Sequence, residues 1–213
     1  MLRSHNKWFI PVALSLVGFA PNTATAFTQA PYTFSANYDT LNTSSGISSN
    51  ISEAFITGES KDAPYGLNKI NGLTYTQADL ASGIFRFNTD PTILGLQGIP
   101  IGSIVFSGNG NNKLFGADNA TGIIDVSALT ARASGTFTIT GGEGIFRGAT
   151  GTLDFSEVDT LSFRSGVPFT GRASVNGTIQ IIPEPKPDIP LLSMGAIIEL
   201  CVLLRRCRPS TFS

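Results

Sequence analysis

Acidic and aromatic side chains gather in one stretch of the chain. The segment from Gly58 to Leu67 holds Glu59, Asp62 and Tyr65. Carboxylates on a loop held by a rigid sheet can bind a cation such as calcium, or act as general acid and base. The alternative interpretation is a solvated turn in which Asp62 caps the backbone and Pro64 fixes the bend.

A second candidate is the Asn- and Gly-rich stretch from Ser107 to Asn119, which contains Asp118. It resembles one nonapeptide of the calcium-binding RTX repeats, with Leu114 in the buried position. That fold holds calcium between stacked turns and needs several repeats, whereas one is present here, so a long hairpin turn is the favoured interpretation. The candidate cation or ligand residues are therefore Glu59, Asp62, Tyr65 and Asp118. We expect no cofactor, with bound calcium as the alternative.

Carboxylates further along the chain offer a third chemistry. Glu143, Asp154, Glu157 and Asp159 lie in or after a glycine-rich segment. Two carboxylates at the correct separation can hydrolyse a glycosidic bond. However, we expect these side chains on the outer face of a strand, and no spacing singles out an acid and its partner.

The cysteine and histidine positions exclude much other catalysis. The only histidine is His5, and the two cysteines are Cys201 and Cys207, all outside the central region 27–182. Nucleophilic sites of the Ser-His-Asp or Cys-His type need an imidazole, and zinc or copper sites need imidazole or thiolate ligands. We therefore expect no enzyme. The central region has an acidic excess, which argues against nucleic acid as a partner.

The first 26 residues have the pattern of a secretory signal peptide. Arg3 and Lys7 precede an uncharged run from Trp8 to Ala20, and small residues follow, among them Ala24 and Ala26. This A-x-A pattern predicts export through the Sec machinery and cleavage after Ala26.

The C-terminal end has three ordered elements. Residues 183–190 form a Pro-rich linker, and residues 191–213 hold a hydrophobic run with an Arg-rich end. The run is short for a bilayer and contains Glu199, which suits a temporary tether better than a permanent anchor. An uncleaved single-pass anchor is the alternative. The sorting residues in this segment are Pro183, Glu184, Pro185, Arg205, Arg206 and Arg208.

These elements resemble the PEP-CTERM sorting signal of bacterial exported proteins. The resemblance implies an exosortase-type protease as a partner and a transient tether in the inner membrane. Delivery to the cell surface or the extracellular space would follow, with a link to exopolysaccharide.

β-Strands must position the candidate residues, because period-two alternation runs through the central region. From Tyr32 to Asp39 the even positions are apolar and the odd ones polar, which is typical of a half-buried strand. Only Tyr75 to Leu80 has a weak helical pattern. We predict one all-β domain over 27–182, an antiparallel barrel or sandwich. The other predicted strands are Ala54–Gly58, Gly72–Thr76, Ile84–Asn88, Ser103–Ser107, Gly122–Ser127, Ala133–Thr140, Gly151–Ser156 and Ala173–Ile181.

A glycine-rich segment from Ile139 to Gly151 adds a resemblance at the level of the fold. It is similar to the hairpin of the allene oxide cyclase and dirigent barrels, in which glycines adopt positive φ and would let Phe146 fold back against the barrel end. The whole central region resembles uncharacterised cyanobacterial PEP-CTERM proteins.

Three functions remain open from the sequence. The first is a non-catalytic cell-surface or matrix component that contacts exopolysaccharide. The second is a carrier of a small apolar ligand, or a cyclase-like barrel, with a Phe-lined mouth. The third is a glycan-active enzyme that uses acids alone.

Overall fold

The computed structural model describes residues 30–162 and 167–182. The signal peptide with Ala24 and Ala26, and the sorting segment from Pro183 to Arg208, lie outside these residues. The described ranges hold three short 3₁₀ helices, η1 (Pro64–Gly66), η2 (Pro91–Leu94) and η3 (Gly144–Phe146), and nine strands. The strands are β1 (Tyr32–Gly46), β2 (Ile51–Glu59), β3 (Lys69–Asp79), β4 (Ile84–Asn88), β5 (Ser103–Ser107), β6 (Lys113–Asp125), β7 (Thr130–Glu143), β8 (Ala149–Thr160) and β9 (Phe169–Ile181).

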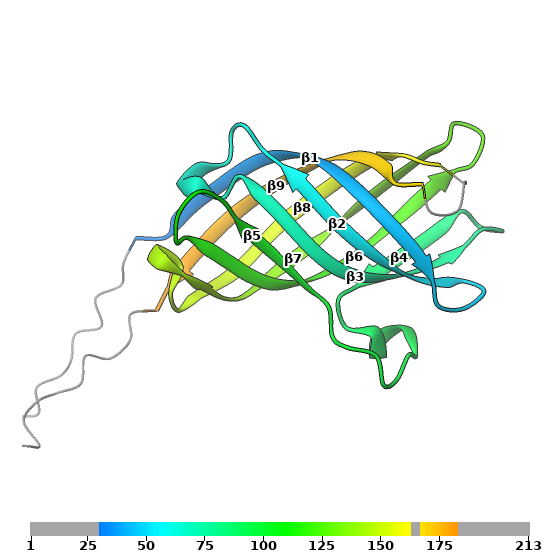
Figure 1. The fold of residues 1–213 in the computed structure, drawn as a ribbon, viewed down its shortest axis with the longest axis horizontal. Coiled ribbons are helices and arrows are strands. Elements are labelled where there is room, and N and C mark those ends of the chain that lie inside the picture. Colours follow the sequence, from blue (N-terminus) through cyan, green and yellow to red (C-terminus); the bar gives the residue numbers. More distant parts are fainter. Residues whose placement is uncertain (1–29, 163–166, 183–213) are drawn as a thin grey trace, which may run out of the picture.

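The strands form a closed antiparallel β-barrel (Figure 1). Neighbouring strands pair around the barrel in the order β2, β1, β9, β8, β7, β6, and the pairing of β2 with β3 closes it. Strands β4 and β5 share one position, because each pairs with both β3 and β6. The barrel therefore has eight strand positions. This confirms the predicted all-β fold and selects the barrel over the sandwich.

The alternation in the sequence sets which side chains enter the barrel. Phe34, Ala36 and Tyr38 of β1 are buried, as the even-position pattern predicts. Val175 and Ile179 of β9 are buried in the same way. Since successive side chains of a strand point to opposite faces, the intervening polar residues lie outside. The observed bounds of β4 and β5 are those predicted.

Three local predictions were wrong. The segment Tyr75 to Leu80 is not helical, because its residues up to Asp79 belong to β3 and pair with β2 and β4. Strand β6 begins at Lys113, nine residues before the predicted start, because β7 pairs along its whole length. Strand β7 runs from Thr130 to Glu143, three residues beyond the predicted Ala133–Thr140 at each end, because it pairs with β6 over this whole length.

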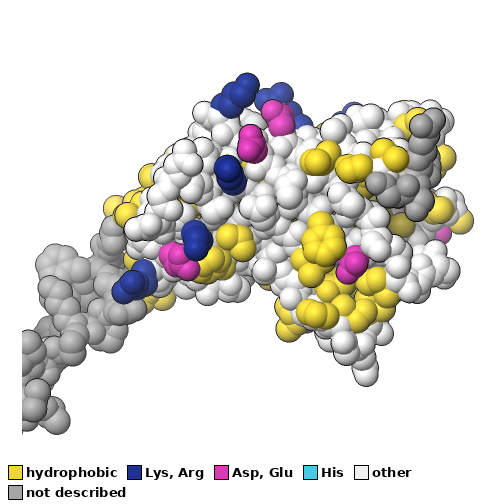
Figure 2. All heavy atoms as spheres, in the orientation of Figure 1, with side chains coloured by type: hydrophobic (Ala, Val, Ile, Leu, Met, Phe, Trp, Pro, Cys, Tyr) yellow, Lys and Arg dark blue, Asp and Glu magenta, His cyan; other side chains and the backbone are white. Residues whose placement is uncertain are grey.

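An excursion between β4 and β5 covers part of the outer face of the barrel. It contains η2, and its Leu94 is buried with Tyr75 and Ile51. The Tyr75 hydroxyl donates a hydrogen bond of 2.6 Å to the carbonyl of Pro100. Figure 2, which has the orientation of Figure 1, shows hydrophobic side chains gathered on this face of the molecule. The excursion thus buries apolar residues that would otherwise face water.

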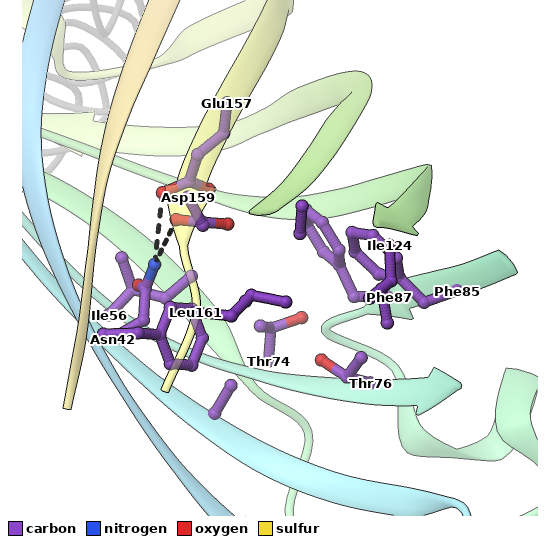
Figure 3. Close-up of a pocket in the computed structure, with 13 residues that line it drawn as sticks. Asn42, Ile56, Thr74, Thr76, Phe85, Phe87, Ile124, Glu157, Asp159 and Leu161 are labelled. Atoms are coloured by element: carbon purple, nitrogen blue, oxygen red, sulfur yellow. Dashed lines mark hydrogen bonds between the residues drawn. The ribbon is translucent and has the colours of Figure 1, made fainter. Parts of the chain in front are cut away.

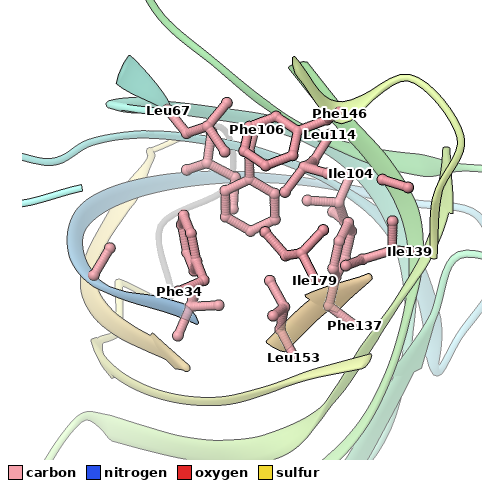
Figure 4. Packing of buried hydrophobic residues seen from close by; sticks show 14 of the residues in the cluster. Phe34, Leu67, Ile104, Phe106, Leu114, Phe137, Ile139, Phe146, Leu153 and Ile179 are labelled. Atoms are coloured by element: carbon pink, nitrogen blue, oxygen red, sulfur yellow. The ribbon is translucent and has the colours of Figure 1, made fainter. Parts of the chain in front are cut away.

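One end of the barrel is filled by its main hydrophobic core. Aromatic and aliphatic side chains from most of the strands point inward there (Figure 4). Phe106 contacts Phe34 and Phe137 edge-on, with ring centroids 5.9 and 5.0 Å apart. The Tyr38 hydroxyl donates to the carbonyl of Leu67 at 2.5 Å. This end is therefore closely packed with apolar side chains.

The glycine-rich hairpin closes the same end, as the sequence predicts. Gly144 and Gly148 both have positive φ, which a residue with a Cβ rarely adopts. Between them Phe146 is fully buried and contacts the rings of Tyr32 and Tyr65. The predicted packing of Phe146 against the barrel end is confirmed.

Candidate functional site

The opposite half of the barrel holds a cavity of about 140 Å³ (Figure 3). Its wall is largely apolar, with Phe85, Phe87 and Ile124 on one side. Leu161 and Phe169 are half-buried lining residues, so the cavity reaches solvent at this end. A smaller cavity of about 40 Å³ lies deeper, and the two cavities share Ile56, Phe87 and Glu157 as lining residues.

A polar cluster lies in the wall of these cavities. Glu157 and Asp159 extend from β8, and Thr40 and Asn42 extend from β1. The Thr40 hydroxyl donates to Glu157 Oε1 at 2.7 Å. Asn42 Nδ2 donates to Glu157 Oε1 at 3.2 Å and to Asp159 Oδ1 at 3.1 Å (Figure 3). All four side chains are buried, so their bonds form away from water.

A glycine lets the cluster form across an intervening strand. Strand β9 lies between β1 and β8, and Gly171 pairs with Thr40 on one side and with Asp159 on the other. A Cβ at position 171 would collide with Asp159 Oδ1 and approach Thr40 Oγ1. Because Gly171 has no side chain, the polar side chains of β1 and β8 can meet over its backbone inside the barrel.

Asp118 is a third buried carboxyl, and it lines the deeper cavity. Its Oδ1 accepts a hydrogen bond of 3.1 Å from the Thr74 hydroxyl. Burial, with a smaller contribution from the charge of Glu157, raises the pKa of Asp118 to about 7, although the hydrogen bond from Thr74 opposes the shift. Asp118 therefore exchanges its proton near neutral pH.

Asp159 on β8 also resists ionisation. Burial, and then the charge of Glu157, raise the pKa of Asp159 well above its ordinary value. None of the residues that line the two cavities is basic. In the part of the chain that the structure describes, the one ion pair joins Lys113 to Glu143 on the exposed surface, at 2.8 Å. Among the described residues, the interior carboxyls thus have no cationic partner.

The segment from Gly58 to Leu67 lies at the packed end, where its side chains form hydrogen bonds with strand β1. Asp62 is exposed and accepts bonds from the backbone N–H of Asn37 at 3.0 Å and from its Nδ2 at 2.9 Å. These bonds hold the pKa of Asp62 at about 2. The Tyr65 hydroxyl donates to the carbonyl of Thr33 at 2.9 Å.

The predicted loop residues do not form one site. Glu59 and Asp62 are exposed, whereas Asp118 is buried inside the barrel on β6. Among the described residues, no group of three or more His, Cys, Asp or Glu side chains could hold a metal ion. The RTX-like stretch is a hairpin between β5 and β6, as favoured, and its turn ends before Asp118.

The predicted outward position of Glu157 and Asp159 was wrong. Both side chains point into the barrel, at 7% exposure each, while Asp154 on the same strand is exposed. The signal was present in the sequence, because these acids share the odd parity of the buried Leu153. Alternation predicts an inward position for both acids, which here outweighs the usual preference of carboxylates for the surface.

Fold and cavity together define a closed antiparallel barrel with one packed end and one hollow, acid-lined end. Comparisons with protein-family models, with curated proteins and with solved structures found no match. Across the described ranges, no helix has the length and apolar character needed to cross a membrane.

Proposed function

We propose that this protein binds a small, mostly apolar ligand inside its barrel. The observation that carries the proposal is the cavity of about 140 Å³, lined by Phe85, Phe87, Ile124 and Leu161. Apolar pockets with a few convergent polar groups are the usual form of small-molecule sites. A cavity of roughly 150 Å³ accepts one benzene molecule, which sets the size of the ligand.

The distribution of packing within the barrel supports this proposal. One end is filled by close-packed aromatic residues, whereas the other encloses open space beside buried polar groups. Filling a cavity with an apolar group gains contacts that the empty wall lacks. The rigid packed end would hold the strands of the hollow end in place and so preform the site.

Export and sorting are proposals that rest on the sequence. They comprise Sec export, exosortase-type processing and delivery to the cell surface or extracellular space. The intact mass of the protein isolated from its native cells tests the processing, since retention of Arg205 and Arg206 would contradict it. A matrix role beside exopolysaccharide and the absence of enzymatic activity also stay predictions.

Ligand binding is tested with toluene and the full-length chain. We expect saturable binding by ligand-observed NMR. Ala131 is buried in the cavity wall, so Ala131→Leu should fill part of the space and weaken binding roughly tenfold. Ser134→Leu is the matched control, because Ser134 is exposed on the same strand, and it should leave binding unchanged.

Thr76→Leu offers a second way to fill the cavity if Ala131→Leu does not fold, because Thr76 lines it from another strand. Toluene binding that survives both substitutions, or no binding to the wild type, would contradict the proposed function.

A further inference from the structure

The cavity presents more hydrogen-bond acceptors than donors. Glu157 and Asp159 offer four carboxyl oxygens, and the donors that reach them are the Thr40 hydroxyl and Asn42 Nδ2. No basic residue is among the described residues that line the cavity. Two buried carboxyls side by side without a cation favour a bound proton or a positively charged partner.

A separate observation points to a missing donor at the same place. Asn42 is 4% exposed, and its Oδ1 is buried without any hydrogen-bond partner. Its Nδ2 is already engaged by the two carboxyls, which fixes the orientation of the amide. Buried polar atoms in native proteins are rarely left unpaired, so this oxygen calls for a donor that the described residues do not supply.

The opposite wall of the cavity suits the same kind of group. Phe85 and Phe87 are stacked, with ring centroids 6.3 Å apart, and Phe87 lies 5.7 Å from Phe155. The faces of aromatic rings attract cations as well as apolar groups. The carboxyl pair and Asn42 lie across the pocket from Phe85 and Phe87 (Figure 3).

We propose that the ligand is a small primary amine with an apolar body about the size of one aromatic ring. Its ammonium group would donate to Glu157, Asp159 and Asn42 Oδ1, and its apolar body would lie against Phe85 and Phe87. A primary ammonium has three donors, which matches these three acceptor groups. This inference rests on the proposed function and adds the chemical class of the ligand.

The test compares three probes that share one ring: benzylamine, benzyl alcohol and benzoate. Their affinities for the full-length chain are measured by isothermal titration calorimetry at neutral pH. Because hydrogen bonds between charged groups are about twice as strong as neutral ones, benzylamine should bind roughly tenfold more tightly than benzyl alcohol. Benzoate should not bind, because it would bring a further negative charge to the carboxyls.

Glu157→Gln and Asp159→Asn test which residues receive the amine. Each variant replaces an ionisable carboxyl by an amide and nearly keeps the shape of the side chain. In each, the affinity for benzylamine should fall roughly tenfold, while that for benzyl alcohol should change less than about twofold. Asp154→Asn is the control, since Asp154 is exposed on the outer face of the same strand, and it should change neither affinity.

Binding of benzyl alcohol shows that a variant is folded. If one carboxyl variant binds neither benzylamine nor benzyl alcohol, the other carboxyl variant provides the test. If benzyl alcohol binds as tightly as benzylamine, the amine inference fails and the proposed function stands. If neither benzylamine, benzyl alcohol nor toluene binds the wild type, both fail. A benzylamine preference that persists in both folded variants would overturn the assignment to the carboxyl pair.

Discussion

Replacing Asp118 by Asn should change how the stability of the barrel depends on pH. Asp118 is 5% exposed, and burial raises its pKa from an ordinary value of 3.8 to about 7. Between these two values the folded chain holds a proton that the unfolded chain has lost. The free energy of unfolding of the wild type therefore falls as pH rises from about 4 to about 7, and this contribution is constant above that range.

The size of the effect follows from the same two values. A pKa difference of about three units at roughly 1.4 kcal/mol per unit gives about 4 kcal/mol. Asn cannot ionise, and its carbonyl oxygen can still accept the bond from Thr74. Between about pH 4 and about pH 8, the stability of Asp118→Asn relative to the wild type should thus rise by about 4 kcal/mol.

Urea unfolding followed by circular dichroism across this pH range measures the difference. Every other titratable side chain is the same in both proteins, so the difference between the two stability curves reports the effect of the Asp118 carboxyl. Asp154→Asn serves as the control, because its exposed carboxyl should leave the difference from wild type flat. Parallel stability curves for Asp118→Asn and the wild type would refute the reasoning, since they would mean that Asp118 ionises normally inside the barrel.

Three further predictions concern the packed end. Phe146→Ala should lower the free energy of unfolding by about 3–5 kcal/mol, because the ring is fully buried. Ile145→Ala is the control, since Ile145 is exposed, and it should change this free energy by less than about 1 kcal/mol. Similar losses for the two variants in urea unfolding would contradict the prediction. Tyr38→Phe should cost roughly 1–2 kcal/mol in the same assay, because it removes a buried hydrogen bond. The Asp62 carboxyl should titrate at a pKa of about 2 in ¹³C NMR, and Asn37→Ala should raise that pKa; a normal value in the wild type would disprove the bonding to Asn37.

The fold could largely be predicted because burial in a barrel alternates residue by residue. The even positions of β1 and the glycine-rich hairpin each carried a local signal that the structure confirms. Closure of the barrel had no such signal. It depends on backbone pairing between β1 and β9, and between β2 and β3, which no local pattern reports.

The candidate site was predicted less well, because polar residues inside a barrel violate the usual pattern. Alternation alone places Asp118 with Leu114 and Glu157 with Leu153 on the inner face, against the usual preference of carboxylates for water. The role of Gly171 could not be predicted either. It appears only when the register shows which side chains flank that glycine across β9.

The central claim is that a small apolar ligand occupies the hollow half of the barrel. Intermolecular NOEs between toluene and the methyl groups of the full-length chain test it most directly. We predict NOEs to the cavity-lining Ile56, Ile124 and Leu161. NOEs confined to the exposed Ile84 and Ile123, or none to the cavity-lining methyl groups, would contradict it.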